Sequence, residues 1–531
     1  MKPYPPFPHL LRRLSQDTAG NTLAMIAAAL VPLLAIVGGG VDVSRGYLAQ
    51  SRLQQACDAG VLAARKRMGA NIIDGVLTAE AASAGQKFFD VNFKDGMYGT
   101  QASTFAMSVQ PDFSIEGVAN VVVPTTIMNI FGYRQMPLQA ECGAQLTMSN
   151  TDVMMVLDTT GSMSAKNAGD TKNKIETLKD TVRSFYATLN SASSPATRIR
   201  YGFVPYSTNV NVGHLLAQDW IARYADYNTR EPVTLLGVKL WHYDKINVDT
   251  NFLWSGSPTK QFPIGGTASS PTQLTIGWGG CIEERQTYEI TDYTNVDLSK
   301  ALDLDIDMVP DPAKPDTQWK PLLADLGFAR GIGAAPNAFN VLPLDTAAQY
   351  INPNWYGYAA CPPKAKKLSP MTAAEVDAYL ATLSPYGSTY HDIGMIWGGR
   401  LISPTGIFAG ENADIGGQAT SRHLIFLTDG QTAPLDISYG AYGIEPLDRR
   451  RWKPGSALSL TKTVENRFSF ACEEVKKKNV TVWVIAFGTS LNPMLTACAG
   501  NGHYFEANDA LTLEQTFQKI AKKIGQLRIS K

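Results

Sequence analysis

The sequence has no excess of charge of either sign, because its 47 basic residues are matched by 47 acidic ones. Proteins that bind nucleic acid need a concentrated basic field that neutralises phosphates. The formal net charge of zero gives no support for that class. We therefore expect no nucleic-acid partner.

The motifs of the common enzyme classes are also missing. There is no G-x-S-x-G elbow and no G-x-x-x-x-G-K-[ST] phosphate loop, and the six histidines show no H-E-x-x-H spacing. His391 and Asp392 are neighbours, which leaves a metal-dependent hydrolase as an alternative. We nevertheless predict that the chain is not an enzyme.

Cysteine is scarce, and its six positions are too dispersed for a C-x-x-C metal site. Their even number fits an oxidising compartment and up to three disulfides, with buried free thiols in a cytosolic protein as the alternative. The pairs that we consider plausible are Cys57 with Cys142, Cys281 with Cys361, and Cys472 with Cys498. Sequence alone does not fix this connectivity.

One long hydrophobic run is present, from Thr22 to Val41, twenty residues without a charge. A helix of this length spans a hydrocarbon core of ~30 Å. We predict a transmembrane helix over 21–41 after a cytoplasmic tail of residues 1–20. A cleaved signal peptide and a buried core helix are the alternatives, but the run continues directly into an alanine-rich amphipathic stretch, which favours an uncleaved anchor. The cysteines place the large C-terminal part outside.

The rest of the chain divides into two patterns. Residues 42–150 contain helical stretches, including 75–92, and then short alternating runs over 98–148 that are typical of strands. Residues 151–531 predict an α/β domain with a doubly wound parallel sheet. A stretch rich in Pro, Gly, Trp and Tyr over 209–383 is too long for a connection and predicts an inserted subdomain. The expected strands are 153–158, 198–207, 422–429 and 480–488, and the expected helices are 171–190, 391–401, 460–478 and 509–526.

Oxygen-bearing side chains follow two of the predicted strands. Asp158 ends the first strand and is followed by Thr160 and Ser162, and Asp429 ends a later one. Ligands of open α/β folds bind at the carboxyl edge of the sheet, so these loops are expected to meet there, together with Thr389 from a third loop. Carboxylates and hydroxyls are hard ligands, which predicts a Mg²⁺ site, with Ca²⁺ or Mn²⁺ as alternatives.

This triplet resembles the metal-ion-dependent adhesion site (MIDAS) of von Willebrand factor A domains, whose pattern is Asp-x-Ser-x-Ser, a loop Thr and a strand-end Asp. Thr160 departs from that pattern but keeps the hydroxyl. The resemblance implies that a carboxylate of a protein partner completes the coordination of the metal. It therefore implies adhesion or assembly, with a metal-free remnant of the fold as the alternative.

The N-terminal stretch QDTAGNTLAMIAAALVPLLAIVGGGVDVSRGYLAQSRLQQACDAGVLAA resembles TadE/TadG-like proteins of the tight-adherence (Flp) pilus assembly system. In the TadG type this segment is joined to a von Willebrand A-like domain. Met25 stands where pilin processing wants a glutamate, so prepilin cleavage is not predicted. The resemblance implies a component of pilus assembly or adhesion in the bacterial inner membrane, with its large domain in the periplasm and pilus or envelope proteins as partners. A metal-free structural envelope scaffold is the alternative.

Overall fold

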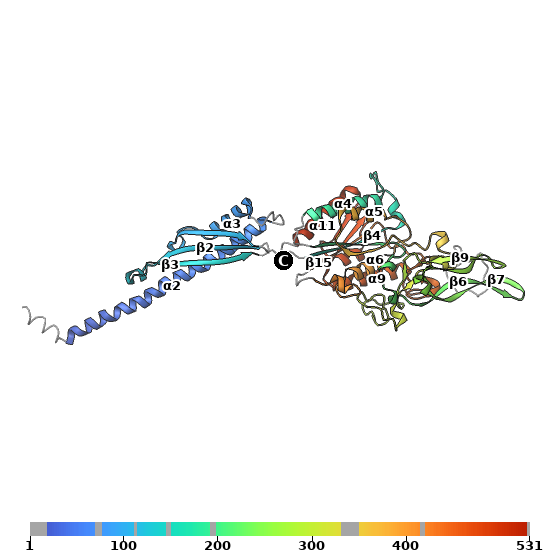
Figure 1. Cartoon of the computed structure of the whole chain (residues 1–531), viewed down its shortest axis with the longest axis horizontal. Coiled ribbons are helices and arrows are strands. Elements are labelled where there is room, and N and C mark those ends of the chain that lie inside the picture. Colours follow the sequence, from blue (N-terminus) through green and yellow to red (C-terminus); the bar gives the residue numbers. More distant parts are fainter. Residues whose placement is uncertain are drawn as a thin grey trace, which may run out of the picture. The chain divides into compact units, whose positions relative to one another are not determined.

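A computed structural model describes residues 18–68, 77–110, 114–144, 150–191, 198–330, 350–414 and 420–527 (Figure 1). Contacts between residues divide the chain into two compact units, Met1–Thr147 and Met148–Lys531. This division falls three residues before the predicted boundary between residues 150 and 151. Most of the predicted cytoplasmic tail lies outside the described residues.

The first unit is built on one long helix, α2 (Thr18–Met68), which contains Pro32. Within the described part of the chain, α2 is the one helix long and apolar enough to cross a membrane, with a mean hydropathy of 2.3 in its most apolar window. Almost all of that window is exposed in the protein, as expected for a surface that contacts lipid and not for a buried core helix. The apolar run and the amphipathic stretch after it therefore form one continuous helix.

A second helix and a three-stranded sheet cover the C-terminal half of α2. Helix α3 (Ala79–Asn92) begins where Thr78 caps the backbone N–H of Ala81, four residues later than predicted. The strands β1 (Gln101–Val109), β2 (Ile115–Pro124) and β3 (Gln135–Ala144) form an antiparallel meander in that order. The predicted run of short strands over 98–148 is present.

The alternation of β2 explains the core of this unit. Every second residue of β2 is buried, so one face packs on the helices and the other faces outward. The Cys57–Cys142 disulfide crosses this core and joins α2 to β3. Phe89 of α3 stacks on Phe105 of β1, with ring centroids 4.6 Å apart.

The second unit contains a six-stranded sheet with the order β14-β5-β4-β15-β18-β19. All neighbouring strands are parallel except β14, which pairs antiparallel with β5 at one edge. Both faces of the central strands are buried, which explains why their sequences are almost entirely apolar. The strands are β4 (Asn150–Asp158), β5 (Ile199–Tyr206), β14 (Lys366–Ser369), β15 (Thr420–Thr428), β18 (Val480–Phe487) and β19 (Tyr504–Ala507).

Helices cover both faces of this sheet (Figure 1). Val153, Met155 and Leu157 of β4 belong to the core beneath one set of helices, whereas Met154 and Val156 belong to the core beneath the other. The mixed α/β architecture expected from the sequence is therefore confirmed. The first set is α4 (Lys174–Ser191), α5 (Ala373–Ala381) and α11 (Ala510–Leu527), and the second is α6 (His391–Ile402), α9 (Leu460–Lys476) and α10 (Pro493–Ala499).

The described residues between β5 and β14 form mostly irregular structure with two long hairpins, and the Cys281–Cys361 disulfide joins the middle of this region to its C-terminal end. We predicted that this insertion extends to residue 383, and that end is wrong. β14 belongs to the main sheet, and Tyr379 of α5 stacks on Phe203 of β5 at 4.6 Å, so the insertion closes before residue 366. Its strands are β6 (Tyr224–Leu235), β7 (Val238–Asp249), β8 (Thr259–Thr267), β9 (Ser270–Gly277), β10 (Ile282–Glu283), β11 (Lys320–Pro321), β12 (Ala329–Arg330) and β13 (Tyr350–Ile351). Other short elements of the unit include α7 (Ala409–Asn412), β16 (Tyr439–Gly440), β17 (Gly443–Ile444) and α8 (Glu445–Asp448).

Buried ion pairs hold the insertion on helices α6 and α9: Glu284 pairs with Arg400 of α6, and Asp303 pairs with Arg467 of α9. Glu284 accepts hydrogen bonds from the Arg400 guanidinium at 2.7 and 3.1 Å, and both side chains are fully buried. Trp397 and Trp319 donate indole N–H groups to the same carboxylate. Burial by itself raises the pKa of Glu284, but Arg400 outweighs it and the pKa is lowered. A charge buried in this way needs all of its partners, so these contacts fix one position of the insertion.

Candidate functional site

Asp158 stands at the carboxyl end of β4 and is completely buried. One carboxylate oxygen accepts the backbone N–H of Thr160 at 2.9 Å. The other accepts the hydroxyls of Thr428 at 2.9 Å and Tyr206 at 3.2 Å. These bonds orient the carboxylate from the strands on either side of β4.

Asp429 follows β15, the strand next to β4, and its carboxylate meets the two hydroxyls of the Asp158 loop. Ser162 Oγ donates to Asp429 Oδ1 at 2.7 Å, and Thr160 Oγ1 lies 3.4 Å from the same oxygen. The two hydroxyl oxygens lie 2.9 Å apart. The structure therefore brings four of the five predicted site residues into one cluster at the carboxyl edge of the sheet.

Thr389, the fifth residue, precedes α6 in a loop that contacts both the loop after Asp158 and the loop after Asp429. Gly161 N donates to Gly387 O at 3.0 Å, which joins the loop to the Asp158 side. The Thr389 carbonyl accepts from Ala433 N at 3.0 Å, which joins it to the Asp429 side. Thr389 itself is buried at the place where the three loops meet.

Lys174 is a member of the site that the sequence did not point to. Its ammonium lies 3.0 Å from Asp429 Oδ2, and the two side chains are 10% and 0% exposed. The lysine comes from the first turn of α4, which starts after the loop that carries Thr160 and Ser162. No spacing rule in the sequence relates a lysine at this point to an aspartate 255 residues later.

Tyr206 and Thr428 also support Asp158 and were not predicted. Tyr206 lies opposite Asp158 in the register of β4 and β5, and Thr428 is the last residue of β15. The order of the predicted strands could have identified them, because neighbouring parallel strands end side by side.

His391 and Asp392 do not form a pair, although they are adjacent in sequence. His391 lies between the hydroxyls of Thr428 and Thr432, each 2.9 Å from a ring nitrogen, whereas Asp392 is bonded to Arg451. Burial lowers the pKa of His391 to about 3, so the ring is neutral near pH 7. His391 therefore positions the hydroxyl of Thr428 through a hydrogen bond, and that hydroxyl in turn donates to Asp158.

The two carboxylates raise the cost of ionisation at this edge. Burial, and after it the nearby charge of Asp429, raise the pKa of Asp158 to about 6. Hydrogen bonds from Thr160 and Thr428 act in the opposite direction but do not cancel these effects. A cation placed between two such carboxylates would stabilise their ionised forms.

The oxygens present fit a hard divalent cation. Among the described residues there is no group of three or more His, Cys, Asp or Glu side chains that could hold a metal, which leaves no rival centre of that kind. The cluster at the sheet edge has two carboxylates and two hydroxyls within hydrogen-bonding reach of one another. This donor set suits Mg²⁺, Ca²⁺ or Mn²⁺ and not a soft transition metal.

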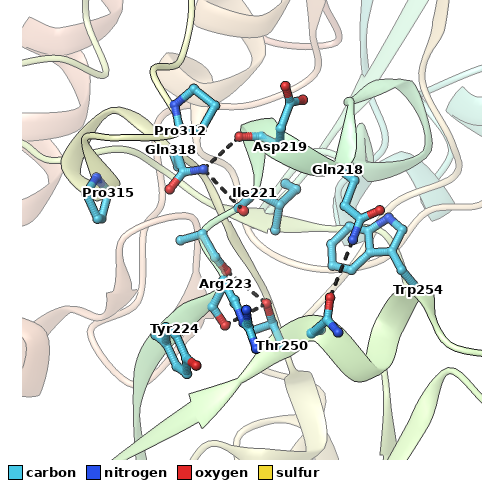
Figure 2. A pocket seen from close by; sticks show the side chains of 12 residues that line it. Gln218, Asp219, Ile221, Arg223, Tyr224, Thr250, Trp254, Pro312, Pro315 and Gln318 are labelled. Atoms are coloured by element: carbon cyan, nitrogen blue, oxygen red, sulfur yellow. Dashed lines mark hydrogen bonds between the residues drawn. The ribbon is translucent and has the colours of Figure 1, made fainter.

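A concave surface also lies in the insertion, lined by residues between positions 218 and 318 and so separate in sequence from Asp158 and Asp429 (Figure 2). This cavity of about 570 Å³ is lined by residues that include Arg223, Tyr224, Trp254 and Gln318. The amide of Gln318 donates to the backbone carbonyl of Asp219 at 2.7 Å and closes one wall. Polar and aromatic groups of this kind could contact a ligand, but they do not form an acid and base pair.

Residues 20–71 match the family model described as putative Flp pilus-assembly TadE/G-like. The resemblance that the sequence indicated is thus confirmed for the N-terminal segment. No curated protein matches the chain.

Several solved structures of pilus proteins are similar to this chain at low identity. The pilus adhesin SpaC from Lactobacillus rhamnosus GG has 12% identity and a TM-score of 0.32, over 80% of this chain and 35% of that one. The chain thus spans about a third of the length of SpaC. The PilB minor pilin from Streptococcus sanguinis has 13% identity and a TM-score of 0.30, over 81% and 79%. The vWF domain of the type V pili tip protein Mfa5 from Porphyromonas gingivalis has 10% identity and a TM-score of 0.33, over 72% and 97%.

Proposed function

Since residues 20–71 are a TadE/G-like pilus-assembly segment, we propose that this protein is a membrane-anchored component of a tight-adherence (Flp) pilus assembly or surface adhesion apparatus. In this proposal the second unit is a von Willebrand A-like domain with a doubly wound sheet, and it binds a protein partner in a metal-dependent way. It acts by binding, not by turnover.

One observation carries the proposal. Two strand-end carboxylates meet at the carboxyl edge of the sheet: Asp158 accepts the backbone N–H of Thr160, and Asp429 accepts the hydroxyl of Ser162, which lies 2.9 Å from the Thr160 hydroxyl. Burying two carboxylates side by side is costly unless a positive charge or hydrogen bonds compensate, and a buried carboxylate with a raised pKa, such as Asp158, is typical of a functional site.

Asp158, Thr160, Ser162, Thr389 and Asp429 would hold the cation. A divalent ion held there would supply a positive charge that a carboxylate of the partner could bind. The protein itself orients the oxygens that would bind the metal, because the hydroxyls of Tyr206 and Thr428 donate to one carboxylate oxygen of Asp158. Partner selectivity would come from the surface around this edge and from the insertion.

The proposed location is the bacterial inner membrane, with the second unit on the periplasmic side. Helix α2 supplies a single span, and all six cysteines are paired in three disulfides, as oxidising compartments allow. The three pairs are those considered from the sequence.

A specific contact favours a second candidate, the metal-free envelope scaffold. The Lys174 ammonium already gives Asp429 a positive partner at 3.0 Å, so the cluster has part of its charge balanced without a metal. In that case the sheet edge would be a structural remnant, and partner binding would not depend on divalent ions.

Calorimetric titration of the full chain in nanodiscs with Mg²⁺, Mn²⁺ and Ca²⁺ separates the two candidates. The test variant is Asp158→Ala/Asp429→Ala, and the control is Asp377→Ala, which removes an exposed aspartate of α5. We expect saturable binding in the wild type and the control that is lost in the double variant. A folded wild type that binds none of the three ions would overturn metal dependence and leave the scaffold.

A further inference from the structure

Asp42 lies one residue beyond the predicted membrane span and is buried against the turn between β2 and β3. Its carboxylate accepts three backbone N–H groups, from Thr126, Ile127 and Met128, each at 2.9 Å. Arg45, one turn further along α2, donates to Thr126 Oγ1 at 2.8 Å. Burial by itself raises the pKa of Asp42, but the three backbone donors and Arg45 lower it, so the carboxylate is ionised and holds the turn near neutral pH.

The turn reaches past Asp42 into the span itself. A Cβ atom on Gly38 would lie 2.1 Å from the side chain of Ile127, so only glycine allows this contact. The sulfur of Met128 would lie 3.5 Å from a Cβ on Gly39, which is an ordinary van der Waals contact. Gly38 lies three residues inside the predicted end of the span at Val41, or ~5 Å along a helix.

The tip of this turn is apolar and uncovered. Ile130 is 80% exposed and Tyr133 is 67% exposed, with Phe131 between them at 36%. Turns that face water usually carry Gly, Asn, Asp, Ser or Pro, and large apolar side chains there are unusual. Tyrosine and other amphipathic aromatic residues gather at the level of lipid headgroups. Arg134 follows at the end of the turn and is exposed as well.

We infer that the β2–β3 turn, residues 125–134, is a second membrane contact that inserts its apolar tip into the interfacial region of the bilayer beside α2. The inference rests on the proposed anchoring of residues 21–41. The bilayer is the occupant because the turn is continuous with the exposed apolar surface of the span, where Ile36 and Val37 are also uncovered. The hydrogen bonds between Asp42 and the turn then fix the first unit against the membrane surface, because the helix and the turn enter the lipid together.

Depth-dependent fluorescence on the full chain tests this arrangement. All six native cysteines are in disulfides, so a cysteine introduced by Ile130→Cys can be labelled selectively with an environment-sensitive fluorophore. The protein is placed in nanodiscs of phosphatidylethanolamine and phosphatidylglycerol, with and without lipids that carry a quencher either near the headgroup or deep in the acyl chain, the second for labels inside the span. We expect a blue-shifted emission that the lipid quencher reduces.

Two further label positions make the result unambiguous. Leu62→Cys is the matched control, because Leu62 is also exposed and apolar. It lies twenty residues beyond Asp42 on the same helix, ~30 Å away. A label at position 62 should therefore stay unquenched. Leu33→Cys reports on the span. A quenched label at position 33 with a water-exposed label at position 130 would overturn the membrane contact of the turn while the anchor stands. A water-exposed label at position 33 would overturn the anchor and, with it, the inference.

The role of Asp42 in holding the turn is tested separately in the Ile130→Cys background. Asp42→Ala removes the acceptor of three backbone bonds, and the label at position 130 should lose most of its lipid quenching while the label at position 33 keeps its own. Unchanged quenching at position 130 would show that the turn is not held by Asp42.

Discussion

The Lys174 ammonium and the Asp429 carboxylate form a buried ion pair, with Nζ 3.0 Å from Oδ2, at the edge where the candidate metal ligands gather. A lysine in this position supplies a positive charge that a divalent ion would otherwise bring. The lysine and a metal held by the same carboxylate would repel each other, since both side chains of the pair are buried and little water screens them. Lys174 is therefore expected to set the affinity of the site for cations.

Lys174→Met should tighten binding of Mg²⁺ or Mn²⁺ about 10- to 100-fold, as a unit charge a few ångströms away is worth a few kcal/mol in a partly screened site. The same variant should lower the thermal midpoint of the metal-free protein, because Asp429 loses its partner. Titration calorimetry and metal-dependent melting measure both effects. Lys172→Met is the control, because Lys172 pairs with Asp180 in an exposed position nearby. Weaker metal binding in Lys174→Met would contradict a competing lysine.

Acid should destabilise the second unit through His391. Its pKa is about 3 in the folded protein because of burial, against an unperturbed value of 6.5, so the unfolded chain binds a proton that the folded one excludes. The contribution of His391 to stability is complete above pH ~6.5 and falls as the pH drops toward 3, by about 2 kcal/mol at pH 5. Urea unfolding from pH 7 to pH 4 should show this slope, and His391→Gln should flatten it. An unchanged slope in the variant would assign the acid sensitivity to other groups.

The disulfides should differ in what they contribute. Cys57–Cys142 closes a segment of 85 residues and Cys472–Cys498 a segment of 26. Chain entropy then predicts a loss of about 4–5 kcal/mol for the first and about 3–4 kcal/mol for the second when both cysteines of a pair become alanine. Differential scanning calorimetry should show the first change in the melting of residues 1–147 and the second in that of residues 148–531. An equal loss for both pairs would argue that strain or packing, and not loop closure, dominates.

Breaking the buried ion pair of Glu284 and Arg400 should release the insertion. Glu284→Ala leaves the Arg400 guanidinium buried without its carboxylate, which costs about 3–5 kcal/mol. Limited proteolysis is expected to cut the insertion earlier than in the wild type. Glu231→Ala serves as the control, since Glu231 lies on β6 of the same insertion and is more than half exposed. Equal proteolysis of the two variants would show that the pair does not hold the insertion.

The sequence by itself determined the features that depend on local pattern. A charge-free run of twenty residues identifies the apolar part of α2, and four apolar runs identify β4, β5, β15 and β18 within three residues of their ends. Because parallel strands end at one edge, the positions of Asp158 and Asp429 were enough to predict that they meet. The short edge strand β14 was missed, as four residues carry too little periodicity to stand out from a loop.

Only the tertiary structure decided which distant residues become partners. The Lys174–Asp429 pair joins residues 255 positions apart, and the contact of Gly38 with Ile127 joins helix α2 to a turn that no sequence motif marks. The same holds for the choice of disulfides and for the point at which the insertion ends. Hydrophobic periodicity and turn chemistry act over a few residues, whereas these contacts follow from how whole helices and strands pack, and packing depends on every neighbouring side chain at once.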